Sequence, residues 1–85
     1  MNYVIVDVET TGGNTKDSKI TELAMYKHDG TQVIDHFQSL VNPEQAIPEF
    51  IVRLTGITDK MVTNAPKFYE LAKQIIEFCE GYFFY

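Results

Sequence analysis

The sequence has 85 residues, a formal net charge of −5 and 45% hydrophobic residues, including six Phe and five Tyr. This length allows one small domain at most, and the apolar content excludes a disordered tail. No unbroken apolar stretch approaches the roughly 18 residues of a membrane span, and Met1-Asn2-Tyr3 lacks the basic start of a secretory signal. The acidity argues against a module that coats duplex DNA through a broad basic face, but it allows an enzyme that grips one strand end through metal ions and backbone amides.

An apolar run from Tyr3 to Val8 predicts a first strand that is buried on both faces. Asp7 and Glu9 stand at i and i+2, so they share a face about 6.6 Å apart along the backbone. Two such acids repel each other unless a cation sits between them, and Mg²⁺ or Mn²⁺ suits oxygen ligands. A plain polar turn at a strand end remains the alternative for this pair alone. Thr10-Thr11-Gly12-Gly13 then breaks the strand, and its glycines allow close approach to a ligand.

Two more strands are predicted next, at residues 20–27 and 32–41. Asp29-Gly30 between them predicts a hairpin with a type I′ turn, which needs positive φ at both central residues. The first three strands would therefore form an antiparallel meander at one side of a sheet. The single cysteine, Cys79, excludes an internal disulfide and agrees with a reducing, cytoplasmic location.

The rest of the chain predicts helices. Pro48 suits the first turn of a short helix that runs to about Thr55 and stops at Gly56, and Thr58 caps another brief turn. Pro66 opens the clearest helix, which Gly81 ends. Its apolar stripe follows the helical period and contains Phe68, Leu71, Ala72, Ile75, Ile76 and Cys79, the last as a buried structural thiol. The final residues, Tyr82–Tyr85, predict the start of a fourth strand.

Asp7-x-Glu9-Thr10-Thr11-Gly12, directly after an apolar strand, resembles the first motif of the DnaQ-like 3′–5′ exonucleases. These enzymes belong to the DEDD superfamily, whose α/β fold is ribonuclease-H-like. Weaker motifs follow in the family's order: Ile20-x-Glu22-Leu23-Ala24, Leu40-Val41-Asn42-Pro43, Ile47-Pro48, Leu54-Thr55-Gly56-Ile57-Thr58, Met61-Val62 and Ala65-Pro66-x-Phe68. The resemblance thus covers nearly everything from Tyr3 to Glu80.

The resemblance implies hydrolysis of terminal phosphodiesters of DNA from a 3′ end, with two Mg²⁺ or Mn²⁺ ions in the complete enzyme. Asp7 and Glu9 would be the catalytic metal ligands. Thr10, Thr11 and Gly12 would approach the terminal nucleotide, and Leu54, Thr55 and Gly56 would line its base and sugar. For the second segment the alternative is a helix C-cap with a core leucine, and relatives often carry His where Thr55 stands. The partners implied are a single-stranded or frayed 3′ end, RNA included, and a replicative polymerase subunit.

The same family needs four carboxylates and a His or Tyr as general base, and the later ones follow the strand that begins here at Tyr82. We therefore expect residues 1–85 to be the N-terminal part of a single exonuclease domain, similar to a DNA polymerase III epsilon subunit, truncated and inactive alone. The unpaired edge at Tyr82–Tyr85 would favour self-association. A non-catalytic interaction module, or a metal-binding module without hydrolysis, is the alternative. Proofreading, repair and RNA trimming remain open, as does the identity of the base.

Overall fold

The structure, a computed structural model, describes residues 2–12 and 16–84. Three strands come first, β1 (Tyr3–Thr10), β2 (Ile20–His28) and β3 (Val33–Leu40). Three helices and a short strand follow, namely α1 (Glu49–Thr55), α2 (Asp59–Val62), α3 (Phe68–Cys79) and β4 (Phe83–Phe84). The strand order is β3-β2-β1-β4, with the first three strands antiparallel and β4 parallel to β1. The predicted meander is confirmed; Gly13 and Tyr85 lie outside the described residues.

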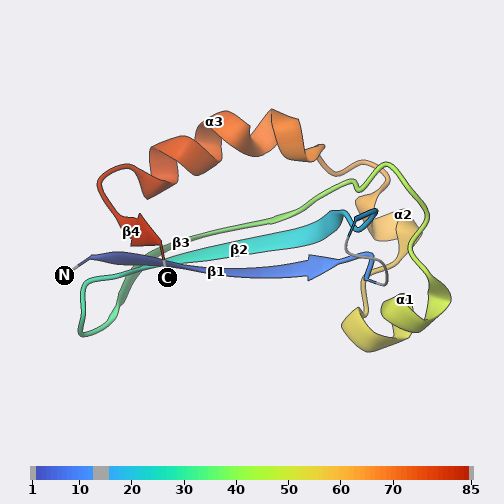
Figure 1. Cartoon of the computed structure of the whole chain (residues 1–85), viewed down its shortest axis with the longest axis horizontal. Helices are drawn as coiled ribbons and strands as arrows, with labels where there is room; N and C mark the ends of the chain where they lie inside the picture. The colour runs from blue at the N-terminus through green and yellow to red at the C-terminus, as the bar shows by residue number, and fades with distance from the viewer. Residues whose placement is uncertain (1, 13–15, 85) are drawn as a thin grey trace.

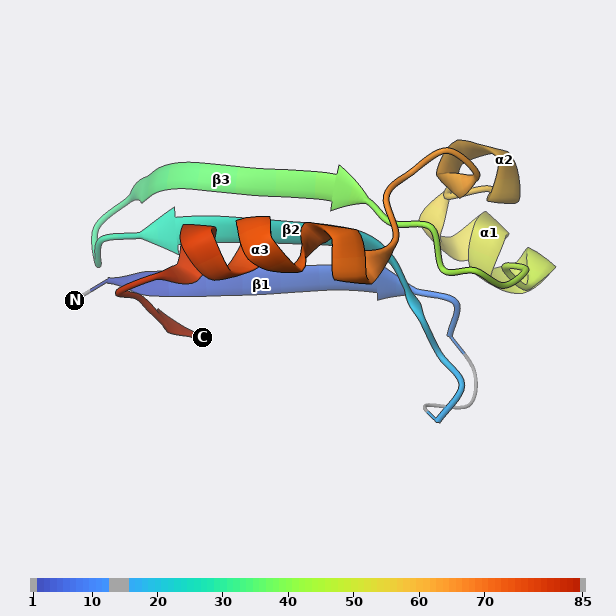
Figure 2. The ribbon, with the colours of Figure 1, turned by 90° about the horizontal axis from the view of Figure 1, so that it is seen from above.

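The layers are visible in two views. In Figure 1, α3 lies above the sheet, while α1 and α2 lie beyond the end towards which β1 runs. Figure 2, seen from above, places α3 along β1 and β2 and again sets α1 and α2 past the strand ends. Within the described residues, no helix covers the face of the sheet opposite α3 (Figure 1). No helix of the described residues is long and apolar enough to cross a membrane.

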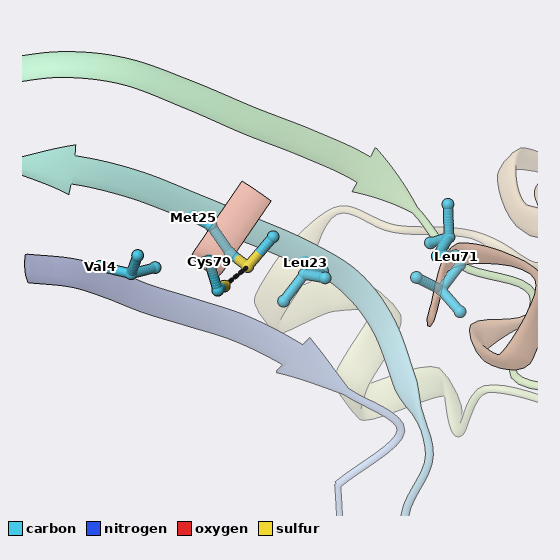
Figure 3. Close-up of a cluster of buried hydrophobic side chains, with 6 residues drawn as sticks. Val4, Leu23, Met25, Leu71 and Cys79 are labelled. Atoms are coloured by element: carbon cyan, nitrogen blue, oxygen red, sulfur yellow. Dashed lines mark hydrogen bonds between the residues drawn. The ribbon is translucent and has the colours of Figure 1, made fainter. Parts of the chain in front are cut away.

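The main core lies between α3 and the sheet. Val4 of β1, together with Leu23 and Met25 of β2, packs against Leu71 and Cys79 of α3 (Figure 3). The Cys79 Sγ lies 3.7 Å from the Met25 Sδ, and burial raises the pKa of this thiol. The expectation of a buried structural cysteine is therefore confirmed. A second cluster of Ile47, Ile51, Ile57 and Val62 joins α1 to α2.

The apolar stripe of α3 differs from the predicted one at Phe68 and Ile76. Leu71 and Cys79 are buried, and Ile75 and Phe78 pack against the same cluster. Ile76, however, is 69% exposed, and Phe68 is 47% exposed and lies outside that cluster. Each helical residue turns the side-chain direction by about 100°, so Ile76 cannot share the face that Ile75 presents to the core. The inclusion of Phe68 and Ile76 in the core-facing stripe was wrong.

The expectation that β1 is buried on both faces was also wrong. Val4 is fully buried, but Ile5, Val6 and Val8 are 39%, 38% and 39% exposed. The physical reason is the short neighbour on one side, because β4 pairs only with Tyr3 and Val4. Beyond these two positions β1 is an edge strand, and one of its faces has no layer against it among the described residues.

The hairpin between β2 and β3 forms where expected but not with the expected turn. Glu44 is the only non-glycine residue with positive φ in the described part of the chain, so Asp29 does not adopt the type I′ geometry. Instead, the Asp29 carboxylate accepts hydrogen bonds from the backbone N–H groups of Thr31 (2.8 Å) and Gln32 (2.9 Å). A local side-chain cap replaces the tight two-residue turn.

The helix boundaries follow the predicted signals closely. Gly56 ends α1 in the left-handed conformation (φ 78°), and the Thr58 hydroxyl accepts a bond from the Met61 N–H at the start of α2. Pro48 stands at the N-cap of α1 rather than inside its first turn. These local signals fix the short helices next to the end of β1.

Candidate active site

Asp7 and Glu9 project from the face of the sheet opposite α3. Residues in a strand alternate between faces, and Val4 points into the core beneath α3. Odd-numbered positions of β1 therefore face the other way. Asp7 is exposed and Glu9 is half-buried. The two acids thus share one face, as the i, i+2 spacing predicts, at the end of β1 that adjoins α1 and α2 (Figure 1).

The strand register adds a third acid to this face. Glu9 lies directly opposite Glu22 in the antiparallel pairing of β1 with β2, and Asp7 lies opposite Ala24. Directly opposed residues share a face, so Glu22 stands on the same side as the pair. Its carboxylate accepts a hydrogen bond of 3.0 Å from the Gln38 side-chain amide of β3. Glu22 is therefore a hydrogen-bonded neighbour of the acidic pair rather than an isolated surface residue.

The charge around this pair is not balanced by basic side chains of the described residues. The ion pairs there lie elsewhere, at Arg53–Glu49, Lys67–Glu44 and Lys73–Glu77. Two carboxylates on one face with no basic partner form an oxygen donor set that suits a hard divalent cation. Within residues 2–12 and 16–84, no three or more acid, His or Cys side chains are close enough together to hold a metal ion. The assignment of Asp7 and Glu9 as metal ligands therefore stays a prediction.

The turn after β1 is held by its own threonines. The Thr10 hydroxyl accepts a bond of 3.0 Å from the Gly12 N–H. Thr11 is only 2% exposed; its hydroxyl donates to Gln45 Oε1 (2.8 Å) and accepts from the Lys19 N–H (3.1 Å). The side chain of Thr11 is thus occupied within the fold, and the role that the structure gives it is to fix the turn.

Gly12 brings α1 against this turn. Its φ is +70°, and a Cβ built on it would come within 3.0 Å of Ile51 Cγ1 and closer still to Cδ1. Only glycine combines this backbone conformation with so close a neighbour. The helix that carries Leu54 and Thr55 is therefore packed directly on the turn that follows the two acids.

The second expected ligand segment, Leu54-Thr55-Gly56, is at the C-terminal end of α1. Leu54 is 79% exposed, whereas Gly56 is the C-cap. The Thr55 hydroxyl donates to the Ile51 carbonyl (2.9 Å) and accepts from the Ile57 N–H (3.1 Å). The alternative prediction for this segment was a helix C-cap with a core leucine. The C-cap at Gly56 is confirmed, whereas the prediction that Leu54 lies in the core is wrong. Leu54 offers an apolar side chain to solvent.

Three residues outside the predicted set support this site. Gln45, 34 positions away along the chain, accepts a hydrogen bond from the Thr11 hydroxyl, and the Lys19 N–H donates one to it. Ile51 packs on Gly12. Gln45 lies in an irregular segment with no periodicity, so only the three-dimensional structure reveals its contact.

Comparison with known proteins identifies the family of this chain. Residues 4–83 match the family model RNase_T, described as Exonuclease. A DNA polymerase III PolC-type from Bacillus cereus is 45% identical over 75 residues, which cover 88% of this chain and 5% of the relative. The 3′-5′ exonuclease DinG of Bacillus subtilis is 36% identical over 83 residues, covering 96% of this chain and 9% of the relative. The chain thus spans a small fraction of these curated relatives.

Solved structures show the same fold. The nuclease domain of 3′hExo, described as a DEDDh family member bound to rAMP, matches with a TM-score of 0.79 and 28% identity, over 93% of this chain and 44% of that chain. A full-length 3′-exonuclease matches with a TM-score of 0.80 and 25% identity, over 93% of this chain and 29% of that chain. The expected α/β, ribonuclease-H-like fold, represented by its N-terminal portion, is therefore confirmed.

Proposed function

The chain belongs to the exonuclease family whose model spans residues 4–83, and from this we propose that it is part of a metal-dependent 3′–5′ exonuclease domain that acts on DNA ends. A polymerase-associated role, as in proofreading, is supported by the PolC-type relatives. The family assignment does not include the 3′–5′ direction of digestion, the divalent metal or the DNA substrate, and these three are our proposal.

One observation carries the proposal: Asp7 and Glu9 stand on one open face, without a basic partner among the described residues, beside a turn that packs on α1. Two like charges in a fold gain nothing from this placement unless a cation binds between them. Asp7 and Glu9 would hold divalent metal, Mg²⁺ or Mn²⁺. When bound, such ions activate water and stabilise the charge that develops on a phosphodiester during its cleavage.

Residues of this chain would position the 3′ end of the DNA strand. Thr10 and Gly12 would lie next to the terminal nucleotide, on a turn that the Gly12 N–H bond to Thr10 and the buried Thr11 hydroxyl keep in place. Leu54, with its exposed apolar side chain, would contact the terminal base. Thr55 and Gly56 would shape the backbone next to the sugar. The nuclease domain of 3′hExo, 28% identical to this chain, is bound to rAMP, and this supports a nucleotide-containing substrate.

We propose further that these 85 residues bind metal without hydrolysing DNA on their own. The two carboxylates are a partial ligand set in the described part of the chain, and neither histidine lies beside them: His28 is at the far end of β2 and His36 is on β3. A hydrolytic site needs a base to accept the proton of the attacking water. The alternative function for the isolated chain is therefore a metal-binding module.

Titration calorimetry with Mn²⁺ tests the site. We expect heat of binding from the unmodified chain and its loss in Asp7→Asn and Glu9→Gln. Asp35→Asn, which removes a charge from an exposed residue of β3, is the matched control and should bind as the unmodified chain does. Equal binding by all four proteins would refute the assignment of the metal to this pair.

A nuclease assay tests the proposed inactivity. We expect no shortening of 5′-labelled single-stranded DNA in Mg²⁺ or Mn²⁺. Shortening that Asp7→Ala abolishes would show that the chain is active alone, and the order of product lengths would then report the direction of digestion.

A further inference from the structure

A cavity of about 520 Å³ has neither Asp7 nor Glu9 in its lining. It forms where the segment before β2, the segment after β3 and the first turn of α3 meet; its lining includes Ser18, Lys19, Gln45, Phe68 and Tyr69. The volume falls in the range of small-molecule sites, about 300–1,000 Å³. The function proposed above does not use this cavity.

Two aromatic side chains of α3 line the cavity without serving the core. Tyr69 is 68% exposed and Phe68 is 47% exposed. Exposed rings at the side of a cavity offer flat apolar surface, on which a nucleobase of any sequence can stack.

Two side chains of the cavity lining, Lys19 and Gln45, can donate hydrogen bonds to a ligand. The Lys19 ammonium takes part in no ion pair among the described residues. Gln45 uses its Oε1 to accept from Thr11, so its amide nitrogen keeps two N–H donors for a ligand. Glu44, which also lines the cavity, is partly neutralised by Lys67, whose Nζ lies 3.8 Å from the Glu44 carboxylate. Stacking rings together with a cation and amide donors match a ligand that has both an aromatic ring and an anionic group.

We propose that this cavity binds one nucleotide unit, with its base against Phe68 and Tyr69 and its phosphate near Lys19. The choice of a nucleotide rather than another aromatic anion rests on the proposed nuclease function. The site is connected to the acidic pair through the turn after β1: Ser18 donates to the Gly12 carbonyl (2.9 Å), and Gln45 and the Lys19 N–H both bond the Thr11 hydroxyl. A nucleotide held here would therefore touch the residues that fix the turn.

The test uses the whole 85-residue chain, labelled with ¹⁵N, and deoxyadenosine monophosphate in EDTA. EDTA removes divalent metal, so that phosphate binding through the acidic pair is suppressed. We expect amide shifts at Lys19, Gln45 and Tyr69. Tyr69→Ala should weaken binding by about five- to a hundredfold, the range for loss of one stacking contact. Lys19→Gln should weaken it severalfold.

Two matched controls lie on the exposed side of α3. Ile76→Ala removes a side chain that is as exposed as Tyr69 (69% against 68%), and Lys73→Gln removes the same charge as Lys19→Gln. Both should leave binding unchanged. Asp7→Asn should also leave binding unchanged, because the carboxylate is not part of the cavity.

The outcomes separate this inference from the proposed function. Absence of shifts at millimolar nucleotide would overturn the inference while leaving Mn²⁺ binding by Asp7 and Glu9 intact. Binding that requires Mn²⁺ and disappears in Asp7→Asn would place the nucleotide at the acidic pair and would likewise overturn it. Equal binding of ribose 5-phosphate would show a phosphate site without base recognition, again contrary to the proposal. A tetranucleotide that binds more tightly than the monophosphate would identify a strand, and equal affinity a free nucleotide, as the natural source.

Discussion

Gly12 packs directly against Ile51, and this contact joins the turn after β1 to helix α1. A methyl group on Gly12 would meet the Ile51 Cδ1 and Cγ1 atoms, and the residue's φ of +70° is unfavourable for any side chain. The contact links the two segments expected to receive a DNA end, Thr10–Gly12 and Leu54–Gly56, so its geometry bears on function as well as stability.

Gly12→Ala should destabilise the fold for two reasons. The left-handed conformation costs about 1–2 kcal/mol with a side chain, and overpacking against Ile51 adds about 1–3 kcal/mol. Gly56→Ala is a matched control, since Gly56 has a φ of +78° but no atom within 4 Å of the added Cβ; it should show the first cost alone. Urea denaturation measures both.

Ile51→Val, which removes Cδ1, should relieve part of the clash, so the double variant Gly12→Ala/Ile51→Val should lose less stability than the sum of the single changes. Strict additivity would contradict direct contact as the cause.

Two buried threonines should respond in opposite directions to the same substitution. Thr11 and Thr21 are 2% and 1% exposed. The Thr11 hydroxyl makes two hydrogen bonds, whereas the Thr21 Oγ1 has no partner in the described part of the chain. Thr11→Val should destabilise by about 1–3 kcal/mol because it leaves the Lys19 N–H and the Gln45 amide oxygen without their partner.

Thr21→Val should instead stabilise by about 1–2 kcal/mol, because it removes a buried polar group that gains nothing in the fold. Thermal unfolding of the two variants in parallel provides the measurement, with each serving as the control for the other. A loss of stability in both would show that Thr21 has a bonding partner in solution.

The features predicted correctly from the sequence are those that depend on neighbouring residues. The Asp7–Glu9 spacing, the stop at Gly56 and the cap at Thr58 are local, because each depends on residues within a few positions, and the structure confirms these features. The resemblance to a known family predicted the overall fold.

Other features depend on distant parts of the chain. The Thr11–Gln45 bond and the position of Glu22 opposite Glu9 follow from strand register and loop packing. No sequence pattern within the chain fixes these. The prediction of a type I′ turn was wrong for another reason. The Asp29 carboxylate accepts hydrogen bonds from two backbone N–H groups, and these bonds stabilise the hairpin in a different geometry.

The Asp29 cap should make stability depend on pH. Bonds from the Gln32 and Thr31 N–H groups favour the carboxylate and lower the pKa of Asp29 in the folded state. A lowered folded pKa stabilises the fold above the unfolded value, near 3.9, and this stabilisation is lost as the pH falls through the folded pKa. Asp29→Asn keeps an acceptor without the charge, so it should be less stable than the unmodified chain at pH 7.

The stability difference between Asp29→Asn and the unmodified chain should shrink as the pH falls below about 4. Melting temperatures measured from pH 2 to pH 7 would show this. A difference that stays constant across the range would mean that the charge on Asp29 does not contribute through the turn.

The sheet has two free edges, and we expect self-association through the one at β4. β4 pairs with β1 at only two positions, and its other side has no strand among the described residues. Unpaired backbone groups at an edge favour pairing with another copy, and a lysine at the edge opposes it. β3 is the other edge, where Ile34 is 48% exposed.

Phe84→Lys and Ile34→Lys therefore add the same charge to opposite edges. Sedimentation velocity over a range of concentrations should show association of the unmodified chain, weakened by Phe84→Lys and retained by Ile34→Lys. The reverse pattern would assign the contact to β3, because only the edge that pairs should be sensitive to a charge. A monomer at every concentration would refute the expected self-association through this edge.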